Sequence, residues 1–169
     1  LHNPRKPPDM LRISKLTDYG TLILTHMARD PARVFSAAGL ADALGLGVPT
    51  VSKVLKTLGR GALVTSQRGA QGGYSLARPP QQISVAEIID ALEEHPFGLT
   101  ECSASSGLCN MEDGCRIRDN WLRINKVVRH ALQDVSVADM IQPQGCGKGP
   151  DEHLILGPHA VATDKEKRA

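Results

Sequence analysis

This sequence of 169 residues has few aromatic side chains and no long hydrophobic run. Phe, Trp and Tyr make up 3% of the residues, so a core drawn from the 41% of hydrophobic residues must be mainly aliphatic. Nowhere do about eighteen apolar residues follow one another, so we expect no transmembrane helix and no membrane partner. The first nine residues also lack the apolar stretch of a secretory signal. We therefore expect a cytoplasmic protein that forms either one domain of ordinary size or a small domain with appendages.

Cysteine is also scarce, but most of the cysteines lie close together in the sequence. Three of the four cysteines fall within fourteen residues: Cys102, Cys109 and Cys115. In a reducing cytosol, such a group favours metal binding over structural disulfides. The fourth, Cys146, lies between two glycines near the C-terminus, and we do not expect it to bind a metal.

The spacing of the three cysteines suggests the kind of metal site. Thiolates are soft ligands that suit iron–sulfur clusters, zinc and copper(I). Zinc fingers usually bring their cysteines in pairs about two to four residues apart, and neither gap here fits that pattern. Iron–sulfur clusters accept more varied spacing, sometimes with another residue in place of a cysteine. No helix or strand pattern runs between the cysteines, so we expect an irregular loop. A cluster is favoured, with zinc and a set of redox-active or buried thiols as alternatives.

Charge is divided along the chain, although the formal net charge is only +2. Residues 1–80 contain eleven Lys and Arg against four Asp and Glu, whereas residues 81–169 contain nine against fourteen. The basic first half indicates contact with a polyanion such as a nucleic acid. The alternative is chance segregation of charge on a solvated surface.

Helical periodicity in the basic half indicates a helix-turn-helix. Apolar residues recur at helical spacing in a first helix over about 17–29, a second from Ser36 and a third over 48–58. Glycines at 45 and 47 provide a turn between the last two helices. The outer face of the third helix lacks carboxylates, and we predict that it contacts DNA through Thr50, Ser52, Lys53 and Lys56. An ordinary helical hairpin with a solvated face is the alternative.

A β-hairpin wing is predicted after the third helix. Two short apolar runs, at 63–65 and 74–76, flank a glycine-rich segment over 67–73. Such a wing can enter a minor groove, where arginine is attracted by the negative potential. We therefore add four wing residues to the predicted DNA contacts: Arg68, Gln71, Gly72 and Gly73.

The acidic half begins with a helix and contains a longer one. Ser84 and Glu87 form a capping-box pattern at the start of the first helix. A long helix follows the last cysteine, and its apolar residues alternate steps of four and three: Ile117, Trp121, Ile124, Val128 and Ala131. This seam is of the coiled-coil type and predicts a homodimer. The alternative is a helix that docks on its own domain.

These observations predict a mainly α-helical protein with a small β-hairpin wing. The expected organisation is a disordered extension (1–9), a winged helix-turn-helix DNA-binding domain (10–80), a connecting helix (81–98), a cysteine loop (99–116), a dimerisation helix (117–141) and a disordered tail (142–169).

Four segments of the sequence resemble the IscR/NsrR-type family of bacterial winged-helix iron–sulfur regulators. They are Leu16-Thr17-Asp18-Tyr19, the run over 49–53, the wing run over 68–74, and the three-cysteine loop ahead of a long helix. Residues 10–20 and 69–74 are most similar to the regulator of the SUF iron–sulfur assembly operon. The resemblance covers about three quarters of the chain.

The resemblance implies a homodimer that binds palindromic promoter DNA and holds a 2Fe-2S or 4Fe-4S cluster through Cys102, Cys109 and Cys115. It also implies a repressor, not an enzyme, that controls iron–sulfur assembly genes in response to cluster status, oxidants or nitric oxide. Where the IscR branch has a ligand histidine, this chain has Arg118, which cannot act as a ligand. In the nitric-oxide-sensing branch, the aspartate that matches Asp18 reaches the cluster of the other subunit.

We therefore expect Asp18 as the fourth ligand, with His26 and His95 as alternatives. Asp18 could instead only favour the N-terminus of its helix. Two further functions remain open from the residues: a small iron–sulfur redox protein, and a zinc-stapled DNA-binding protein without a sensing role.

Overall fold

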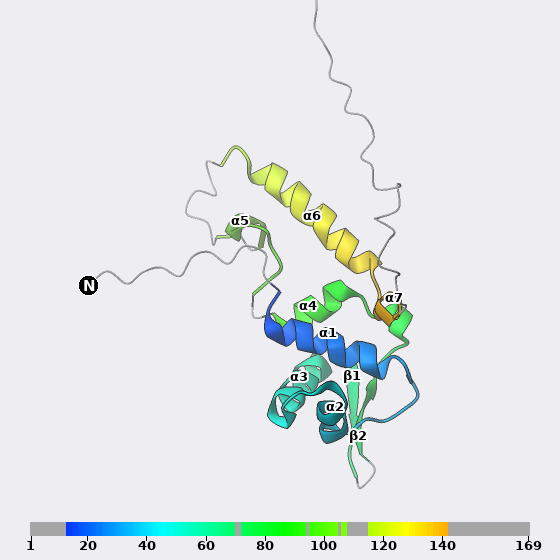
Figure 1. Ribbon diagram of the computed structural model, residues 1–169. Helices are drawn as coiled ribbons and strands as arrows, with labels where there is room; N and C mark the ends of the chain where they lie inside the picture. Colours follow the sequence, from blue (N-terminus) through cyan, green and yellow to red (C-terminus); the bar gives the residue numbers. More distant parts are fainter. Residues whose placement is uncertain (1–12, 70–71, 94, 105, 108–114, 142–169) are drawn as a thin grey trace, which may run out of the picture.

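The computed structural model of the protein describes residues 13–69, 72–93, 95–104, 106–107 and 115–141. Its elements form a body from which one long helix extends (Figure 1). The body contains, in chain order, α1 (Lys15–Met27), α2 (Ala37–Leu44), α3 (Val48–Arg60), β1 (Val64–Gln67), β2 (Gly73–Leu76), the 3-10 helix η1 (Pro80–Gln82) and α4 (Val85–Leu92). They are followed by α5 (Glu101–Ala104), α6 (Arg118–Asp134) and α7 (Val137–Ile141).

Local caps explain where α1 and α2 begin and where α2 ends. The Ser14 hydroxyl accepts a hydrogen bond from the Thr17 N–H at 3.2 Å, and the Ser36 hydroxyl accepts one from the Gly39 N–H at 3.0 Å. Each satisfies a backbone donor that the first turn leaves without a partner. Gly45 ends α2 with φ 64°, a left-handed conformation that glycine adopts without steric cost. The predicted helices are therefore confirmed, with ends shifted by about two residues.

The wing is a two-stranded antiparallel hairpin, as predicted. Val64 pairs with Leu76 at its base and Gln67 pairs with Gly73 near its tip. An isolated bridge between Phe35 and Tyr74, with both N–H···O distances 2.8 Å, adds the segment before α2 to the edge of the hairpin. A Cβ at position 73 would collide with the Phe35 carbonyl, so this glycine is required by packing within the chain.

The core is aliphatic, as the scarcity of aromatic residues predicted. It joins α1, α2 and α3 to the wing and α4, and its fully buried members include Ile23, Leu55 and Ile88. Phe35 is the one buried aromatic side chain among the described residues. The core does not end at the expected domain boundary of residue 80, because Ile83, Ile88, Leu92 and Val137 all belong to it.

The C-terminal end of the described chain returns to this body. We predicted one helix over 117–141, and that prediction is wrong, because α6 ends at Asp134 and α7 begins at Val137. Val135 is extended, and Ser136 forms an antiparallel bridge with Ser84. The Ser136 hydroxyl then caps α7 by accepting from the Asp139 N–H at 3.2 Å. Val137 is fully buried.

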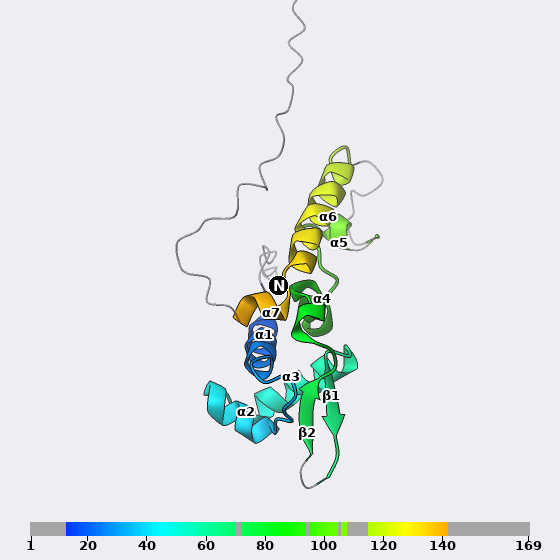
Figure 2. The ribbon, with the colours of Figure 1, turned by 90° about the vertical axis from the view of Figure 1, so that its right-hand side faces the viewer.

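Helix α6 extends from the winged domain and is more exposed than the helices of that domain. In two perpendicular views it runs away from the winged domain, with α4 near one end and α5 beside the other (Figures 1 and 2). It contacts α4 and α5, yet none of its residues is buried. No helix in the described ranges combines the length and apolar character that crossing a bilayer requires.

Candidate DNA interface and cysteine loop

Helix α3 presents the predicted DNA-reading face to solvent. Its opposite face is anchored by Val51, Val54, Leu55 and Leu58, all fully buried. Lys53 and Lys56 are exposed, whereas Thr50 and Ser52 are partly exposed. The structure therefore brings the four predicted residues onto one accessible helix, with hydroxyls and ammonium groups free to meet base edges and phosphates.

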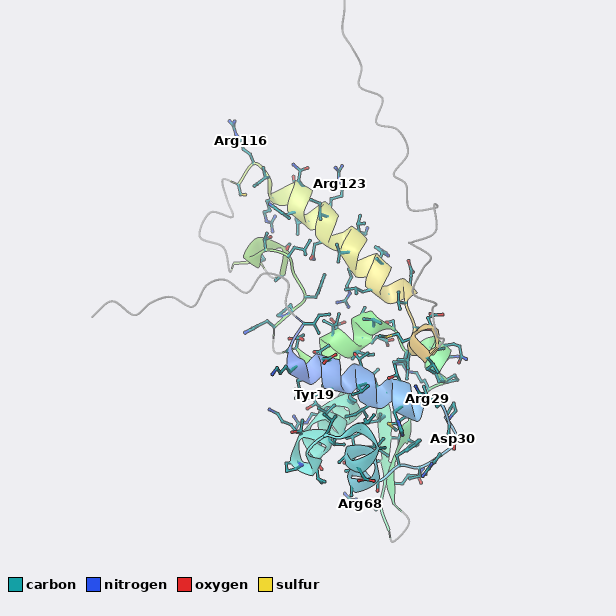
Figure 3. The ribbon with its side chains drawn as sticks, viewed as in Figure 1. Tyr19, Arg29, Asp30, Arg68, Arg116 and Arg123 are labelled. Atoms are coloured by element: carbon teal, nitrogen blue, oxygen red, sulfur yellow. The ribbon has the colours of Figure 1, made fainter. Side chains whose placement is uncertain are left out.

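The wing places another cation at a separate point. Arg68 is exposed and lies near the hairpin tip, at the opposite end of the molecule from Arg116 and Arg123 (Figure 3). Gly69, with φ 120°, adopts a conformation that favours glycine. Gln71 lies outside the described residues. A Cβ at Gly72 would collide with the Gln67 carbonyl. Packing within the chain therefore requires glycine at both 72 and 73, independently of any contact with DNA.

The described parts of the cysteine loop connect α4 to α6. The loop was expected to be irregular, but the short helix α5 includes Cys102 in its backbone. The turn before α5 is tied by the Ser103 hydroxyl, which donates to the Thr100 carbonyl at 3.0 Å. Cys115 is a partly buried free thiol just before α6, and its carbonyl accepts from the Arg118 N–H at 3.3 Å. Cys109 lies outside the described residues.

Asp18 was expected as the fourth ligand, and its side chain is exposed in the first turn of α1. Within the described part of the chain, no three His, Cys, Asp or Glu side chains gather closely enough to hold a metal ion. The supply of Asp18 by the partner subunit stays a prediction, since Cys109 lies outside the described residues. His95 is also exposed.

The N-terminus of α1 is tied to the end of α4 through Glu93, a residue that no sequence pattern singles out. One Glu93 carboxylate oxygen accepts hydrogen bonds from the Ser14 N–H at 2.9 Å and from the Thr17 hydroxyl. Partial burial alone would raise the pKa of Glu93, but these hydrogen bonds outweigh it and lower the pKa below its ordinary value. Asp18 is thus held beside the point where the chain leaves α4 for the cysteine loop.

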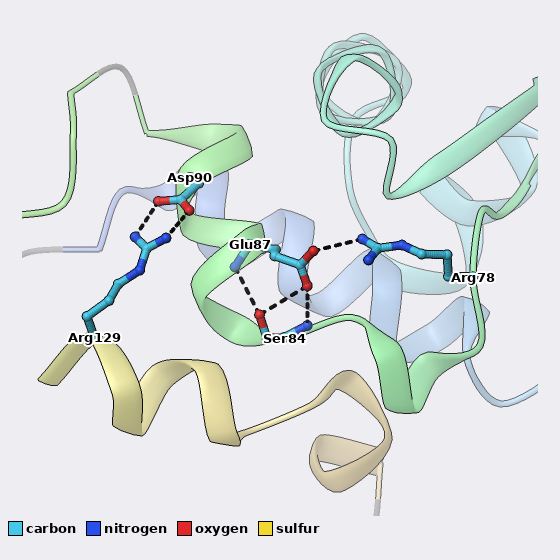
Figure 4. A network of polar contacts seen from close by, with 5 residues as sticks. All are labelled: Arg78, Ser84, Glu87, Asp90 and Arg129. Atoms are coloured by element: carbon cyan, nitrogen blue, oxygen red, sulfur yellow. Dashed lines mark hydrogen bonds and ion pairs between the residues drawn. The ribbon is translucent and has the colours of Figure 1, made fainter. Parts of the chain in front are cut away.

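Helix α4 also connects the wing to α6 (Figure 4). The Arg78 guanidinium, two residues beyond β2, donates to Glu87 at 2.9 Å. Glu87 also closes the predicted capping box with Ser84, whose N–H donates to the carboxylate at 2.9 Å. One turn along α4, Asp90 accepts both ends of the Arg129 guanidinium from α6, one of them at 2.6 Å. Burial would raise the pKa of Glu87, but the Ser84 and Arg78 contacts lower it overall.

A two-stranded wing beside a helix-turn-helix, with a solvent-facing third helix free of carboxylates, defines a winged helix-turn-helix DNA-binding protein. Residues 13–143 match the family model Rrf2, described as an iron-dependent transcriptional regulator. The chain belongs to the Rrf2 family of DNA-binding transcriptional regulators. This membership confirms that the protein is a regulator and not an enzyme.

Solved structures of three relatives share the fold at moderate sequence identity. A putative transcriptional regulator from Listeria innocua is 27% identical, with a TM-score of 0.65 over 87% of this chain and 94% of its own. IscR of T. potens is 28% identical, with a TM-score of 0.60 over 82% and 94%. CymR, the global cysteine regulator of B. subtilis, is 27% identical, with a TM-score of 0.60 over 78% and 97%.

Proposed function

We propose that this protein is a homodimeric repressor whose affinity for promoter DNA is set by an iron–sulfur cluster. Cys102, Cys109 and Cys115 would supply three thiolates, and Asp18 of the partner subunit would supply the fourth ligand. The observation that carries this proposal is the three-cysteine loop, joined directly to α6, in a chain of the Rrf2 family. The similarities to IscR and to CymR are almost equal, so the identity of the signal rests on the cysteines.

The donor set fits a cluster in its chemistry. Thiolates are the ligands that iron–sulfur clusters require, and an oxygen ligand binds iron less tenaciously than sulfur does. Cys115 is not engaged in a disulfide, and the backbones on either side of the loop are anchored to α6. A bound cluster would supply a group that oxidants and nitric oxide attack, and the residues of this chain would convert its loss into a changed placement of α6.

The residues that would transmit this change are in contact in the structure. The Asp90–Arg129 pair joins α6 to α4, and the Arg78–Glu87 pair joins α4 to the wing. A shift of α6 in the dimer would alter the distance between the two recognition helices, and a pair of half-sites at fixed spacing is sensitive to that distance. We further propose that the promoters are those of iron–sulfur assembly genes of the SUF type.

The dimer would form along α6. Ile117, Ile124 and Val127 are 56%, 44% and 59% exposed, and Ala131 is also exposed on this side of the helix. The predicted seam is divided, since Trp121 and Val128 are half-buried in the single chain. The exposed apolar residues of this helix, none of whose residues is buried, are the part of the molecule that a second α6 would cover.

The cluster is tested with protein purified anaerobically, by measuring iron, acid-labile sulfide and zinc together with the visible spectrum. Cys102→Ser, Cys109→Ser and Cys115→Ser should each lose most of the cluster, whereas Cys146→Ser is the matched control and should retain it. Zinc in place of iron and sulfide would support the zinc-stapled alternative. Asp18→Ala should make the cluster more labile toward oxygen, while a larger effect of His95→Ala would identify His95 as the ligand.

DNA binding is tested by titrating a promoter fragment at several salt concentrations. Lys53→Ala and Arg68→Ala should weaken binding, and loss of one phosphate contact should reduce the salt slope by about one. Arg123→Ala removes a cation from the opposite end of the molecule and should leave both quantities unchanged. Unchanged affinity in both interface variants would contradict this docking mode, and absence of DNA binding in wild-type protein would support the iron–sulfur redox alternative.

A further inference from the structure

Asn125, in the middle of α6, makes two hydrogen bonds to the backbone of the cysteine loop. Its side-chain oxygen accepts from the Leu99 N–H at 3.2 Å, and its side-chain nitrogen donates to the Ser103 carbonyl at 3.3 Å. The side chain is partly buried and α5 packs against α6. The two bonded residues lie on either side of Cys102 in the chain. One carboxamide therefore attaches both flanks of the first cysteine to the helix expected to form the dimer.

The chemistry of this contact requires a group that is both donor and acceptor. A carboxamide is neutral and offers an oxygen acceptor and a nitrogen donor on one short side chain. Aspartate could still accept from Leu99, but its second oxygen would face the Ser103 carbonyl as a like partial charge. Leucine, of similar size, would leave a partly buried N–H and a partly buried carbonyl without this partner.

Hydrogen bonds within the loop itself also stabilise the turn that Asn125 contacts, so this turn has a defined shape. The Thr100 N–H donates to the Ser103 hydroxyl at 3.0 Å, and that hydroxyl donates back to the Thr100 carbonyl. Ser103 is 9% exposed, which makes it one of the two buried polar residues among those described. The segment 99–104 is therefore a compact turn that leads into α5, and Asn125 fixes this turn to α6.

We infer that Asn125 is the positioning residue of the cluster site: it fixes Cys102 relative to α6 and thereby slows release of the cluster. This inference rests on the proposed function. A thiolate whose backbone is fixed would stay near the group it binds, and this would favour rebinding over release. Freeing the turn removes that advantage and lets the first cysteine move away.

The test compares Asn125→Leu and Asn125→Asp with Asn120→Asp, a change of the same type at an exposed position on the same helix. In apo protein, hydrogen exchange at the Leu99 amide should be about tenfold faster in Asn125→Leu, as expected from loss of a hydrogen bond. Asn125→Asp retains an acceptor and should keep much of this protection. In cluster-loaded protein, transfer of iron to a chelator should be about tenfold faster in Asn125→Leu, with an altered visible circular dichroism spectrum.

The two readouts separate failure of this inference from failure of the proposed function. Faster exchange with unchanged iron release would show that the contact exists but does not position the cluster, and would overturn the inference. Unchanged exchange would show that the contact does not hold the turn, and would overturn it as well. Wild-type protein without iron and sulfide would refute the proposed function, and the cluster role of Asn125 with it, whatever the exchange rates are. Matching melting temperatures of the apo variants would exclude general unfolding as the cause.

Discussion

The winged domain and helix α6 are stabilised in opposite ways. The domain has a continuous aliphatic core in which Ile23, Leu55 and Leu58 are fully buried. Helix α6 has seventeen residues and none of them is buried; polar contacts to α4 and to the cysteine loop hold it within the chain. Most helical stability in proteins comes from packing of an apolar face. The winged domain is therefore complete in one chain, whereas the packing of α6 would be completed by the proposed dimer.

The largest expected effect tests the core of the winged domain. Leu55→Ala removes a fully buried side chain from α3 and should lower the free energy of unfolding by about 2–5 kcal/mol. Val48→Ala, at a position 46% exposed on the same helix, should change it by less than about 0.5 kcal/mol. Urea denaturation followed by circular dichroism measures both. Equal losses in the two variants would contradict the assignment of the core.

The second effect tests the apolar stripe of α6. Ile124→Asp should weaken the dimer by roughly 2 kcal/mol or more, because a charge at the centre of an apolar interface has no partner. Leu122→Asp is the control, since helical geometry places residue 122 on nearly the opposite side of α6. Sedimentation velocity over a range of concentrations measures the monomer–dimer equilibrium. Dissociation in Leu122→Asp alone would assign the interface to the other face.

A smaller effect concerns the attachment of α6 to α4. The side chains of Arg129 and Asp90 are 31% and 43% exposed, so the pair should contribute only about 0.2–1 kcal/mol to stability. A double-mutant cycle with Arg129→Met and Asp90→Asn measures this coupling through urea denaturation. The coupling should decrease at high salt, because exposed charges are screened. A coupling that does not change with salt would contradict an ionic origin.

The smallest effect is a dependence on pH. The pKa of Glu93 is lowered in the folded protein, so its contribution to stability is present above its ordinary value of 4.5 and is lost as the pH falls through the lowered value. Glu87 acts in the same direction. Apo wild-type protein should therefore be destabilised more than Glu93→Gln when the pH falls from 6 to below about 4.5. Parallel pH profiles of the two proteins would contradict a role for Glu93.

Most of the winged domain could be predicted because its signals are local. Apolar periodicity identified the buried residues of α3, and a glycine-rich segment between two apolar runs identified the hairpin. The capping box at Ser84 was also predicted correctly. These features depend on residues a few positions apart, and the sequence displays such spacing directly.

The contacts that join distant segments could not be predicted. Glu93 meets Ser14 and Thr17 across more than seventy residues, and Asn125 meets Leu99 and Ser103 across more than twenty. The end of α6 was missed although Ser136 and Asp139 repeat the capping pattern of Ser84 and Glu87. The apolar residues at 135 and 137 fit helical continuation, and the bridge to Ser84 that makes Val135 extended is a tertiary contact.

The bridge between Ser84 and Ser136 joins the two ends of the segment that contains the cysteine loop and α6. This segment leaves the winged domain and returns to it at the same place. The Val85 N–H donates to the Val135 carbonyl at 2.9 Å, and the Val137 N–H donates to the Ile83 carbonyl at 2.8 Å. With both ends fixed, lengthening a flexible loop within this segment costs little free energy of folding, about 0.6 kcal/mol for each doubling of loop length. The winged fold therefore imposes almost no constraint on how many residues separate the cysteines. Their spacing is free to follow the geometry of the proposed cluster.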